Sequence, residues 1–323
     1  MNGKKVLVTG GSGFIGHHLV RRLLADGASV GVIVRYGNVM KNERLRSIWD
    51  RISIFEADVR NRGALEAVRA FAPQIVFHLA AYNHVGASFL QVEECFDVNA
   101  KGTANVVDTF TTAEKIVCIS TSEVYGMQRE VPFVETMGPE PISPYAITKF
   151  AGELYCRLKQ RENSGPSIVI LRPFNAFGPY QSSKAVIPEL IMNCLLGRPV
   201  QTTEGKQTRE FNYVGDLVDG MIRAAQHAER IEGPINLGCG HDINISDLVM
   251  KIAKLTASKS KIEVGALRYR PTEIWRMYCD NSRATRELGW QPETTIDEGL
   301  RLSVEWFRRY LEAYREMEQK FHL

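Results

Sequence analysis

Residues 5–16 read Lys5-Val6-Leu7-Val8-Thr9-Gly10-Gly11-Ser12-Gly13-Phe14-Ile15-Gly16. The apolar residues 5–9 predict a buried strand, and the glycines stand where this strand turns into the first predicted helix. Glycine there permits a tight turn, close approach of the backbone to a pyrophosphate and close helix-strand packing, while the amino end of the helix faces the phosphates. We therefore interpret the run as a dinucleotide-binding turn. The cofactor contacts that it predicts are Gly10, Gly13, Phe14, Ile15 and Gly16.

The rest of the first half alternates short apolar runs with helical periodicity. Further strands are predicted at residues 29–34, 52–56, 75–79, 116–120 and 167–171, and helices at residues 14–26, 62–71, 92–112 and 144–162, with a polar helix near Glu43. Strands that alternate with helices and are apolar throughout are typical of a parallel sheet covered on both faces. The predicted fold class is α/β, with a Rossmann-type doubly wound parallel sheet.

The pattern changes after Pro173. Glycine and proline become more frequent, and short helices at residues 186–196 and 245–254 alternate with short strands. We predict a smaller, mixed α/β C-terminal domain that binds the substrate. Residues 1–178 are assigned to the dinucleotide-binding domain, with residues 213–238 returning to it, and residues 179–323 to the second domain, which ends in a charged helix at residues 296–320.

Composition excludes several other classes of protein. The 323 residues are 44% hydrophobic and 24% charged, and the 40 basic and 37 acidic residues are interspersed, which argues against nucleic acid and against a membrane surface. The six cysteines include no C-x-x-C pair and are interpreted as reduced thiols, and no metal site is predicted. No apolar run suits a signal peptide or a membrane span, so we expect a cytoplasmic protein.

The residues after the second to fourth strands predict the rest of the cofactor site. Arg35 follows the second strand, where NAD-specific sites usually carry an acidic residue, and a guanidinium suits a 2′-phosphate. NADP is therefore preferred over NAD, although Arg35 can also be a solvated residue beside the adenine. Two further pairs are predicted cofactor contacts: Asp58 and Val59 at the adenine, and Ala80 and Ala81 where the cofactor passes.

Two later stretches of the sequence contain candidate catalytic residues. The first is Ser120-Thr121-Ser122-Glu123-Val124-Tyr125-Gly126, which follows a predicted strand, and the second is Tyr145-Ala146-Ile147-Thr148-Lys149. A tyrosine and a lysine four residues apart lie on one helix face, where the ammonium can stabilise a phenolate and lower the pKa of the phenol. Such a tyrosine is a general base, whereas a surface Tyr-Lys pair is the other interpretation. The hydroxyls and the carboxylate of the first run would converge on the same substrate.

With these runs the chain resembles the extended short-chain dehydrogenase/reductase family, which remodels nucleotide-activated sugars. The resemblance spans nearly the whole length and includes the glycine turn, the two runs above, and residues 78–81, 99–103, 172–175, 208–214 and 288–292. It implies that Thr121, Tyr145 and Lys149 oxidise C4 of a hexose, with hydride passing to the nicotinamide, which Tyr145 and Lys149 also contact.

Glu123 and Ser122 indicate the branch of the family. The resemblance implies that Glu123 takes the C5 proton as water leaves C6, so that the stored hydride returns to C6 and the cofactor ends unchanged. A cap of the following turn is the other interpretation of Glu123. The dTDP-glucose 4,6-dehydratases have an aspartate where this chain has Ser122. Serine there resembles GDP-mannose and UDP-N-acetylglucosamine 4,6-dehydratases, and also UDP-glucuronate-type decarboxylases.

Three other segments favour the dehydratases: residues 83–89, 178–188 and 270–276. We therefore predict a nucleotide-sugar 4,6-dehydratase, a lyase that makes a 4-keto-6-deoxyhexose and is catalysed by Thr121, Ser122, Glu123, Tyr145 and Lys149. The alternative is a 4-epimerase or a decarboxylase with the same tyrosine chemistry. A noncatalytic NADP-sensing protein ranks last, because Thr121, Tyr145 and Lys149 are all present.

The resemblance also predicts how the nucleotide-diphosphate sugar is bound. Asn175, Arg209 and Arg270 are assigned to the diphosphate, because a bidentate guanidinium suits phosphate oxygens. Arg209 can alternatively pair with Glu210. The other predicted substrate contacts are His84, Val186 and Glu273, and His84 can equally be a packed loop residue. By analogy with the family, helices near residues 92–112 and 145–162 would form a homodimer through a four-helix bundle.

Overall fold

A seven-stranded parallel sheet forms the centre of the larger lobe. The computed structural model describes residues 1–36, 43–162, 165–269 and 273–311. The strand order is β11-β6-β5-β4-β1-β2-β3, and neighbouring strands run parallel. The strands are β1 Lys5–Thr9, β2 Ser29–Val34, β3 Ser53–Glu56, β4 Ile75–His78, β5 Lys115–Ile119, β6 Ser167–Pro173 and β11 Pro234–Leu237. The predicted Rossmann-type sheet is confirmed.

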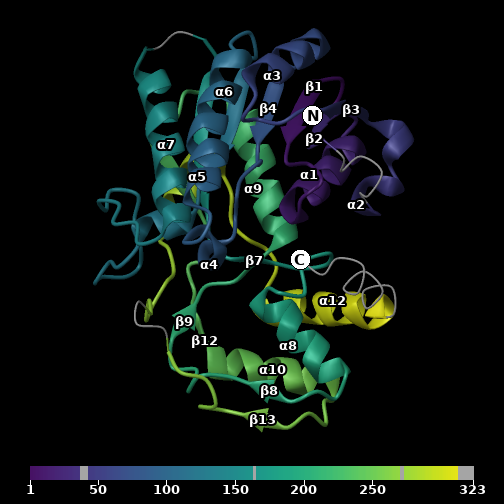
Figure 1. Cartoon of the computed structure of the whole chain (residues 1–323), viewed down its shortest axis with the longest axis vertical. Helices are drawn as coiled ribbons and strands as arrows, with labels where there is room; N and C mark the ends of the chain where they lie inside the picture. Colours follow the sequence, from purple (N-terminus) through teal and green to yellow (C-terminus); the bar gives the residue numbers. More distant parts are fainter. Residues whose placement is uncertain (37–42, 163–164, 270–272, 312–323) are drawn as a thin grey trace.

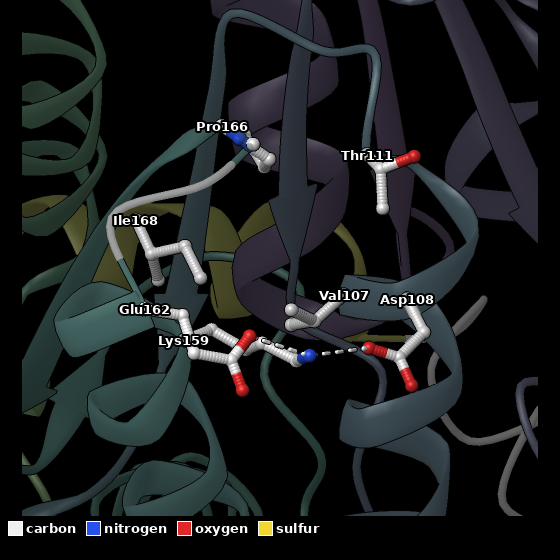
Figure 2. Close-up of a pocket in the computed structure, with 8 residues that line it drawn as sticks. Val107, Asp108, Thr111, Lys159, Glu162, Pro166 and Ile168 are labelled. Carbon is white, nitrogen blue, oxygen red and sulfur yellow. Dashed lines mark hydrogen bonds and ion pairs between the residues drawn. The ribbon is translucent and has the colours of Figure 1, made fainter.

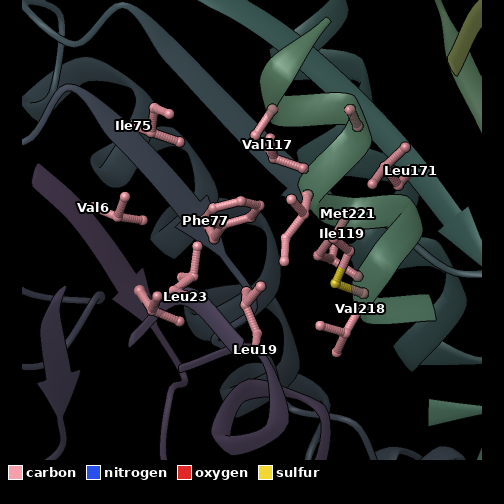
Figure 3. Close-up of a cluster of buried hydrophobic side chains, with 14 of the residues drawn as sticks. Val6, Leu19, Leu23, Ile75, Phe77, Val117, Ile119, Leu171, Val218 and Met221 are labelled. Carbon is pink, nitrogen blue, oxygen red and sulfur yellow. The ribbon is translucent and has the colours of Figure 1, made fainter. Parts of the chain in front are cut away.

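Helices cover both faces of this sheet because successive side chains of each buried strand point to opposite faces. Val6 of β1 packs with residues of α1 Phe14–Ala25 and α9 Val214–Gln226 (Figure 3). Val8 belongs to the same cluster, whereas Leu7 packs on the other face. The helices on that second face are α3 Arg62–Val68, α6 Gly102–Thr109 and α7 Pro144–Glu162. Each fully buried aliphatic side chain stabilises the fold by roughly 1.5–3 kcal/mol.

The second lobe is the smaller, mixed α/β unit that the sequence predicts. Its three main helices, α8 Val186–Leu195, α10 Ile245–Thr256 and α12 Ile296–Arg309, enclose a separate apolar core (Figure 1). Its strands form two-stranded pairs: β8 Val200–Gln201 with β13 Ile262–Glu263, and β9 Thr208–Arg209 with β12 Ile243–Asn244. β7 Ala176–Phe177 pairs with β10 Asn212–Tyr213 where the chain passes between the lobes.

Short helices complete the described chain: α2 Glu43–Arg46, α4 Val85–Ser88, α5 Val92–Cys95, α11 Ser282–Leu288 and the 3₁₀ helices η1 Trp49–Arg51, η2 Arg69–Phe71 and η4 Ser122–Tyr125. The region predicted as one helix at residues 92–112 is instead α5, a π-helical segment η3 Phe96–Lys101, and α6. The predicted final helix begins as expected, because the Thr295 side chain accepts a bond from the Glu298 amide. Its predicted end lies beyond the described residues.

A pocket of about 270 Å³ lies between α6, α7 and the start of β6, at residues such as Asp108, Lys159 and Pro166 (Figure 2). It is at the amino end of β6, away from the strand ends at which open α/β sheets bind ligands.

None of the described helices is long and apolar enough to cross a membrane. Within the described ranges, no three His, Cys, Asp or Glu side chains are grouped as a metal site. All six cysteines are free thiols.

Candidate active site

Gly10 and Gly16 of the turn after β1 stand where a side chain would clash with the backbone. Gly10 has a φ of +69°, and a Cβ there would lie 2.7 Å from the Ala80 backbone nitrogen. A Cβ on Gly16 would lie 2.2 Å from the Gly10 carbonyl oxygen. The helix α1 starts at Phe14 with Gly13 as its N-cap and has no side-chain capping bond. Its first amides therefore face the turn, which fits a bound pyrophosphate.

The residues predicted at the adenine end lie at the ends of β2 and β3. Arg35 is exposed directly after β2. The Asp58 carboxylate accepts bonds from Arg60, whose Nη2 lies 2.7 Å from Oδ2, and these bonds lower the pKa of Asp58. Val59 is buried. The sequence did not single out Arg44, although its Nη1 lies 3.4 Å from the Ser12 carbonyl oxygen at the glycine turn.

Asn99 fixes the chain beyond Ala80 and Ala81. Its Oδ1 accepts from the Tyr82 amide at 2.8 Å, and its Nδ2 donates to the Tyr82 carbonyl and to Thr148 Oγ1. Asn99 lies within η3, and π-helical turns often mark functional sites. The segment next to the predicted cofactor path is thereby tied to α7. From the sequence, Asn99 was named only within residues 99–103, one of the segments that resemble the family.

The candidate catalytic residues meet at the carboxyl end of β5. α7 begins at Pro144 because Ser143 Oγ accepts from the Ala146 amide at 3.1 Å, which places Tyr145 in the first turn. Thr121 is the N-cap of η4, and its Oγ1 accepts from the Glu123 amide at 3.2 Å. Tyr145 is hydrogen-bonded to Thr121 and lies within the electrostatic reach of Glu123. The structure thus brings Thr121, Glu123 and Tyr145 together.

The predicted lowering of the tyrosine pKa is not found. Burial is the largest cause that raises the pKa of Tyr145 to about 12; the hydrogen bond with Thr121 lowers it, and the charge of Glu123 raises it. The Lys149 ammonium donates to the Ile119 carbonyl. Burial also lowers the pKa of Lys149 to about 8. The spacing predicted that Tyr145 and Lys149 share a helix face. Burial of these side chains, however, disfavours both the phenolate and the ammonium.

Lys149 lines a cavity of about 10 Å³ together with His78, Thr103 and Ser120. The buried His78 contacts Thr9 Oγ1 through Nδ1 at 2.8 Å and Thr103 Oγ1 through Nε2 at 3.0 Å. Burial lowers the pKa of His78 to about 3, so its imidazole is neutral near pH 7. A space of this size, with several polar groups among its lining residues, is about large enough for one water molecule.

Ser122, the third candidate on the turn, is buried. Its Oγ lies 3.9 Å from the Met277 sulfur, a long contact to the second lobe. Ser122 therefore lies where the turn meets the second lobe, and Thr121 and Glu123 are the residues of this turn that interact with Tyr145.

The predicted substrate residues are spread along the second lobe and its border. Arg209 pairs with Glu273, with Nη2 2.6 Å from Oε1, which brings together two residues that the sequence assigned to the substrate. The alternative interpretation, an ion pair between Arg209 and Glu210, is wrong. The buried Glu210 carboxylate instead accepts hydrogen bonds from the Cys279 and Gly240 amides. The Glu210 carboxylate is held by amides of two segments that are distant in the sequence, which spacing cannot show.

The remaining substrate candidates differ in their surroundings. Asn175 Nδ2 donates to the Glu210 carbonyl at 2.9 Å, next to Arg209 in the chain. His84 is exposed as the N-cap of α4, and Val186 is 41% exposed at the start of α8. Arg270 lies outside the described residues.

A dinucleotide turn after the first strand, with a tyrosine and a lysine one helical turn apart beside the end of β5, defines a short-chain dehydrogenase/reductase. The family described as GDP-mannose 4,6 dehydratase matches residues 7–303. The chain belongs to this family of extended short-chain dehydrogenase/reductases, and it is an enzyme of the nucleotide-sugar dehydratase and epimerase group.

Curated relatives include both activities. The human dTDP-D-glucose 4,6-dehydratase is 30% identical over 98% of this chain and 93% of its own length. A putative UDP-glucose 4-epimerase of Methanocaldococcus jannaschii is 31% identical over 94% of this chain and 98% of its own length. Identity alone therefore favours neither reaction.

Solved structures match over nearly the whole chain. The UDP-glucose 4-epimerase of Thermotoga maritima, solved with UDP-glucose, has a TM-score of 0.88 and 29% identity over 95% of this chain and all of its own. The UDP-glucuronic acid 4-epimerase of Bacillus cereus, solved with UDP-glucuronic acid and NAD, has a TM-score of 0.86 and 28% identity over 94% of this chain and 99% of its own. These neighbours bind nucleotide sugars, and the second binds NAD.

Proposed function

We propose that the protein is a nucleotide-sugar 4,6-dehydratase, a lyase that converts a nucleotide-diphosphate hexose into its 4-keto-6-deoxy derivative. The observation that carries this proposal is the placement of Glu123 on the turn that also holds Thr121, within electrostatic reach of Tyr145. A carboxylate there supplies a second base beside the one that acts at C4. Dehydration needs both bases, because protons leave from two neighbouring parts of the sugar.

In the proposed reaction, Tyr145 takes the proton of the C4 hydroxyl, and Thr121 hydrogen-bonds the same oxygen. A bound oxidised nicotinamide supplies a hydride acceptor and a positive charge, which favours the phenolate form of Tyr145. With C4 a ketone, Glu123 removes the acidified C5 proton while hydroxide leaves C6, and the two depart as water. The hydride taken from C4 is returned to C6, C5 takes up a proton from solvent, and Tyr145 releases to solvent the proton that it took from the C4 hydroxyl. The products are water and a 4-keto-6-deoxy sugar.

The test is a panel of nucleotide sugars incubated with the protein in heavy water and analysed by NMR. The panel includes UDP-N-acetylglucosamine, GDP-mannose, dTDP-glucose, UDP-glucose and UDP-glucuronate. The proposal predicts a new C6 methyl group together with solvent deuterium at C5 in one of them. An intact hydroxymethyl group with inverted C4 would indicate a 4-epimerase instead, and loss of carbon dioxide a decarboxylase.

A 4-epimerase is the second candidate, and the epimerase relatives favour it. It would use Tyr145 and Thr121 in the same oxidation and return the hydride to the opposite face of C4. The decarboxylase alternative follows from Ser122, because the Thr-Ser-Glu pattern does not separate loss of water from loss of carbon dioxide.

We assign NADP as the preferred cofactor, bound by residues 1–178 with 213–238, and the nucleotide sugar to residues 179–323. Arg35 is exposed directly after β2, the neighbour of β1, and Arg44 Nη1 lies 3.4 Å from the Ser12 carbonyl oxygen of the glycine turn. Positive charge there suits the 2′-phosphate.

Replacing Arg35 with glutamine is expected to weaken NADP binding about tenfold or more, because one charge-assisted contact to the 2′-phosphate is lost. NAD binding should change less than twofold, since NAD lacks that phosphate. Calorimetric titration of wild type and Arg35→Gln with both cofactors measures the two ratios. Arg62→Gln, a half-exposed arginine at the start of α3, is the matched control. Equal changes in NADP and NAD binding would show that Arg35 does not contact the 2′-phosphate.

A homodimer through α5, η3 and α7 is also proposed. Ile147, Leu154 and Leu158 recur at helical spacing on α7 and are 43–50% exposed, and Phe96 on the adjoining η3 is 46% exposed. α5 and α7 lie side by side at the edge of the molecule (Figure 1). An apolar stripe of this kind on two neighbouring helices suits pairing with a second copy of itself.

The double variant Leu154→Glu/Leu158→Glu is expected to weaken the dimer by at least about a hundredfold, since four carboxylates would be buried across a two-fold interface. Sedimentation velocity over a concentration series gives the dissociation constant. Met250→Glu on α10, where the methionine is 59% exposed, should leave the oligomeric state unchanged. A double variant that remains as dimeric as wild type would place the interface elsewhere.

A further inference from the structure

One buried polar network contacts both ends of residues 120–125, the segment that carries Thr121, Ser122 and Glu123. We propose that the Glu153–Arg172 ion pair at the centre of this network positions the segment against Tyr145, so that Glu153 and Arg172 are positioning residues for the reaction. This inference rests on the proposed function. Neither residue has a role that was predicted from the sequence.

The ion pair is fully enclosed and has two bonds. Arg172 Nη2 donates to Glu153 Oε1 at 2.6 Å and Nε donates to Oε2 at 3.0 Å, and the two side chains are 1% and 0% exposed. Glu153 lies on α7 and Arg172 on β6. A bidentate guanidinium-carboxylate pair fixes orientation as well as distance. The pair therefore provides a rigid point between the helix and the sheet.

The amino end of the segment is attached to this point through Ser120. Ser120 Oγ donates to Glu153 Oε2 at 2.9 Å, and the Ser120 amide donates to the Leu171 carbonyl at 2.7 Å. Ser120 is buried and directly precedes Thr121. Its two bonds fix where the chain leaves β5 and hence where the Thr121 hydroxyl lies.

The carboxyl end is attached through Tyr125. The Arg172 guanidinium carbon lies 4.7 Å from the centre of the Tyr125 ring, a cation-π contact between buried groups. The Tyr125 hydroxyl donates to Asn236 Oδ1 at 2.6 Å, and Asn236 Nδ2 donates to the Phe133 carbonyl. Tyr125 is the last residue of η4. Glu123 thus lies between two residues that contact the same ion pair.

The helix that carries the candidate base also carries this pair. Tyr145, Lys149 and Glu153 are four residues apart on α7, so they lie on one helix face. Tyr145 bonds Thr121, Lys149 bonds the Ile119 carbonyl, and Glu153 bonds Ser120. Any change in how α7 lies against β5 would therefore move the base and the turn relative to each other. A displacement of about 1 Å at a reacting centre typically costs about a hundredfold in rate.

Stability alone does not account for an ion pair at this place. Exchanging both members of a buried pair for apolar side chains of similar size is often neutral or stabilising, whereas removing one member leaves an unpaired buried charge. The double variant Glu153→Leu/Arg172→Met therefore separates the two roles. It removes the directional bonds to Ser120 and Tyr125 and keeps the core filled.

The test compares this double variant with wild type in three measurements: thermal unfolding, amide hydrogen exchange of the peptide covering residues 120–126, and steady-state kinetics with the substrate found in the panel. We expect a melting temperature within a few degrees, at least about tenfold faster exchange in residues 120–126 alone, and a kcat lowered about a hundredfold with KM unchanged. Unchanged exchange and unchanged kcat would overturn the positioning role.

A second variant tests the proposal even if the first one folds poorly. Ser120→Ala/Tyr125→Phe removes one hydrogen bond at each end of the segment and leaves the ion pair in place. Faster exchange of residues 120–126 with a lower kcat supports the proposal, and wild-type exchange contradicts it. Tyr155→Phe, which removes a bond to Asp108 on the same helix, is the matched control and should change neither readout. If wild type converts no sugar in the panel, the proposed function fails, and the exchange rates still decide whether the pair fixes the turn.

Discussion

Replacing Tyr145 with phenylalanine is expected to lower the rate of C4 oxidation by about 10³-fold or more, because it removes the phenol oxygen that is hydrogen-bonded to Thr121 and that takes the C4 hydroxyl proton in the proposed reaction. The ring stays in place, so binding of the nucleotide sugar and of the cofactor should change little. Absorbance of the reduced nicotinamide at 340 nm, followed in a single turnover, measures this step apart from dehydration.

The raised pKa of Tyr145, about 12, also predicts a pH dependence. The phenolate is the reactive form, so the oxidation rate of wild type should rise about tenfold per pH unit below the pKa that applies in the complex. The measurement is best made below pH 8, where Lys149, with a pKa of about 8, keeps its charge. Tyr155→Phe serves as the control, since Tyr155 bonds Asp108 away from the site. A Tyr145→Phe variant that oxidised C4 at the wild-type rate would exclude Tyr145 as the base.

Replacing Glu123 with glutamine is expected to have the second large effect. The amide keeps the shape of the side chain and can still accept hydrogen bonds, but it cannot take the C5 proton. Reversible reduction of the cofactor by the sugar should therefore persist, whereas formation of the 6-methyl product should fall by about 10³-fold. Single-turnover absorbance at 340 nm measures the first step, and NMR of the product measures the second.

The control for this substitution is Glu130→Gln, which changes an exposed carboxylate on the loop after the turn. It should leave both steps at the wild-type rate. Dehydration at a normal rate in Glu123→Gln would show that another group removes the C5 proton, and the capping interpretation of Glu123 would then be preferred. Loss of both steps together would point to a disturbed turn, which hydrogen exchange of residues 120–126 would reveal.

Much of the fold could be predicted because local patterns decide it. Apolar runs of strand length, glycines after β1 and the Ser143-Pro144 start of α7 each act within a few residues, and the observed bounds of these elements differ from the predicted ones by about two residues or fewer. The π-helical segment η3 was not predicted, because a single wider turn inside a longer helix is too short to change its apolar pattern recognisably.

The site was predictable as a set of residues, but less so as a set of contacts. The Tyr-Lys spacing placed Tyr145 and Lys149 on one face, yet it could not show that the ammonium bonds the Ile119 carbonyl or that burial raises the tyrosine pKa. Glu153 continued the same four-residue spacing and would have been a usable signal. Its partner Arg172 lies on a strand, and pairs that distant in sequence follow from packing and not from spacing.

The most direct measurement uses a nucleotide hexose that carries deuterium at C4. Dehydration removes this label from C4 as a hydride and returns it to C6, while epimerisation returns it to C4. The product should therefore carry deuterium in a new C6 methyl group, with C4 as a ketone, and Glu123→Gln should stop before the label reaches C6. Deuterium found again at C4 of an inverted sugar with an intact hydroxymethyl group would contradict the assignment as a 4,6-dehydratase.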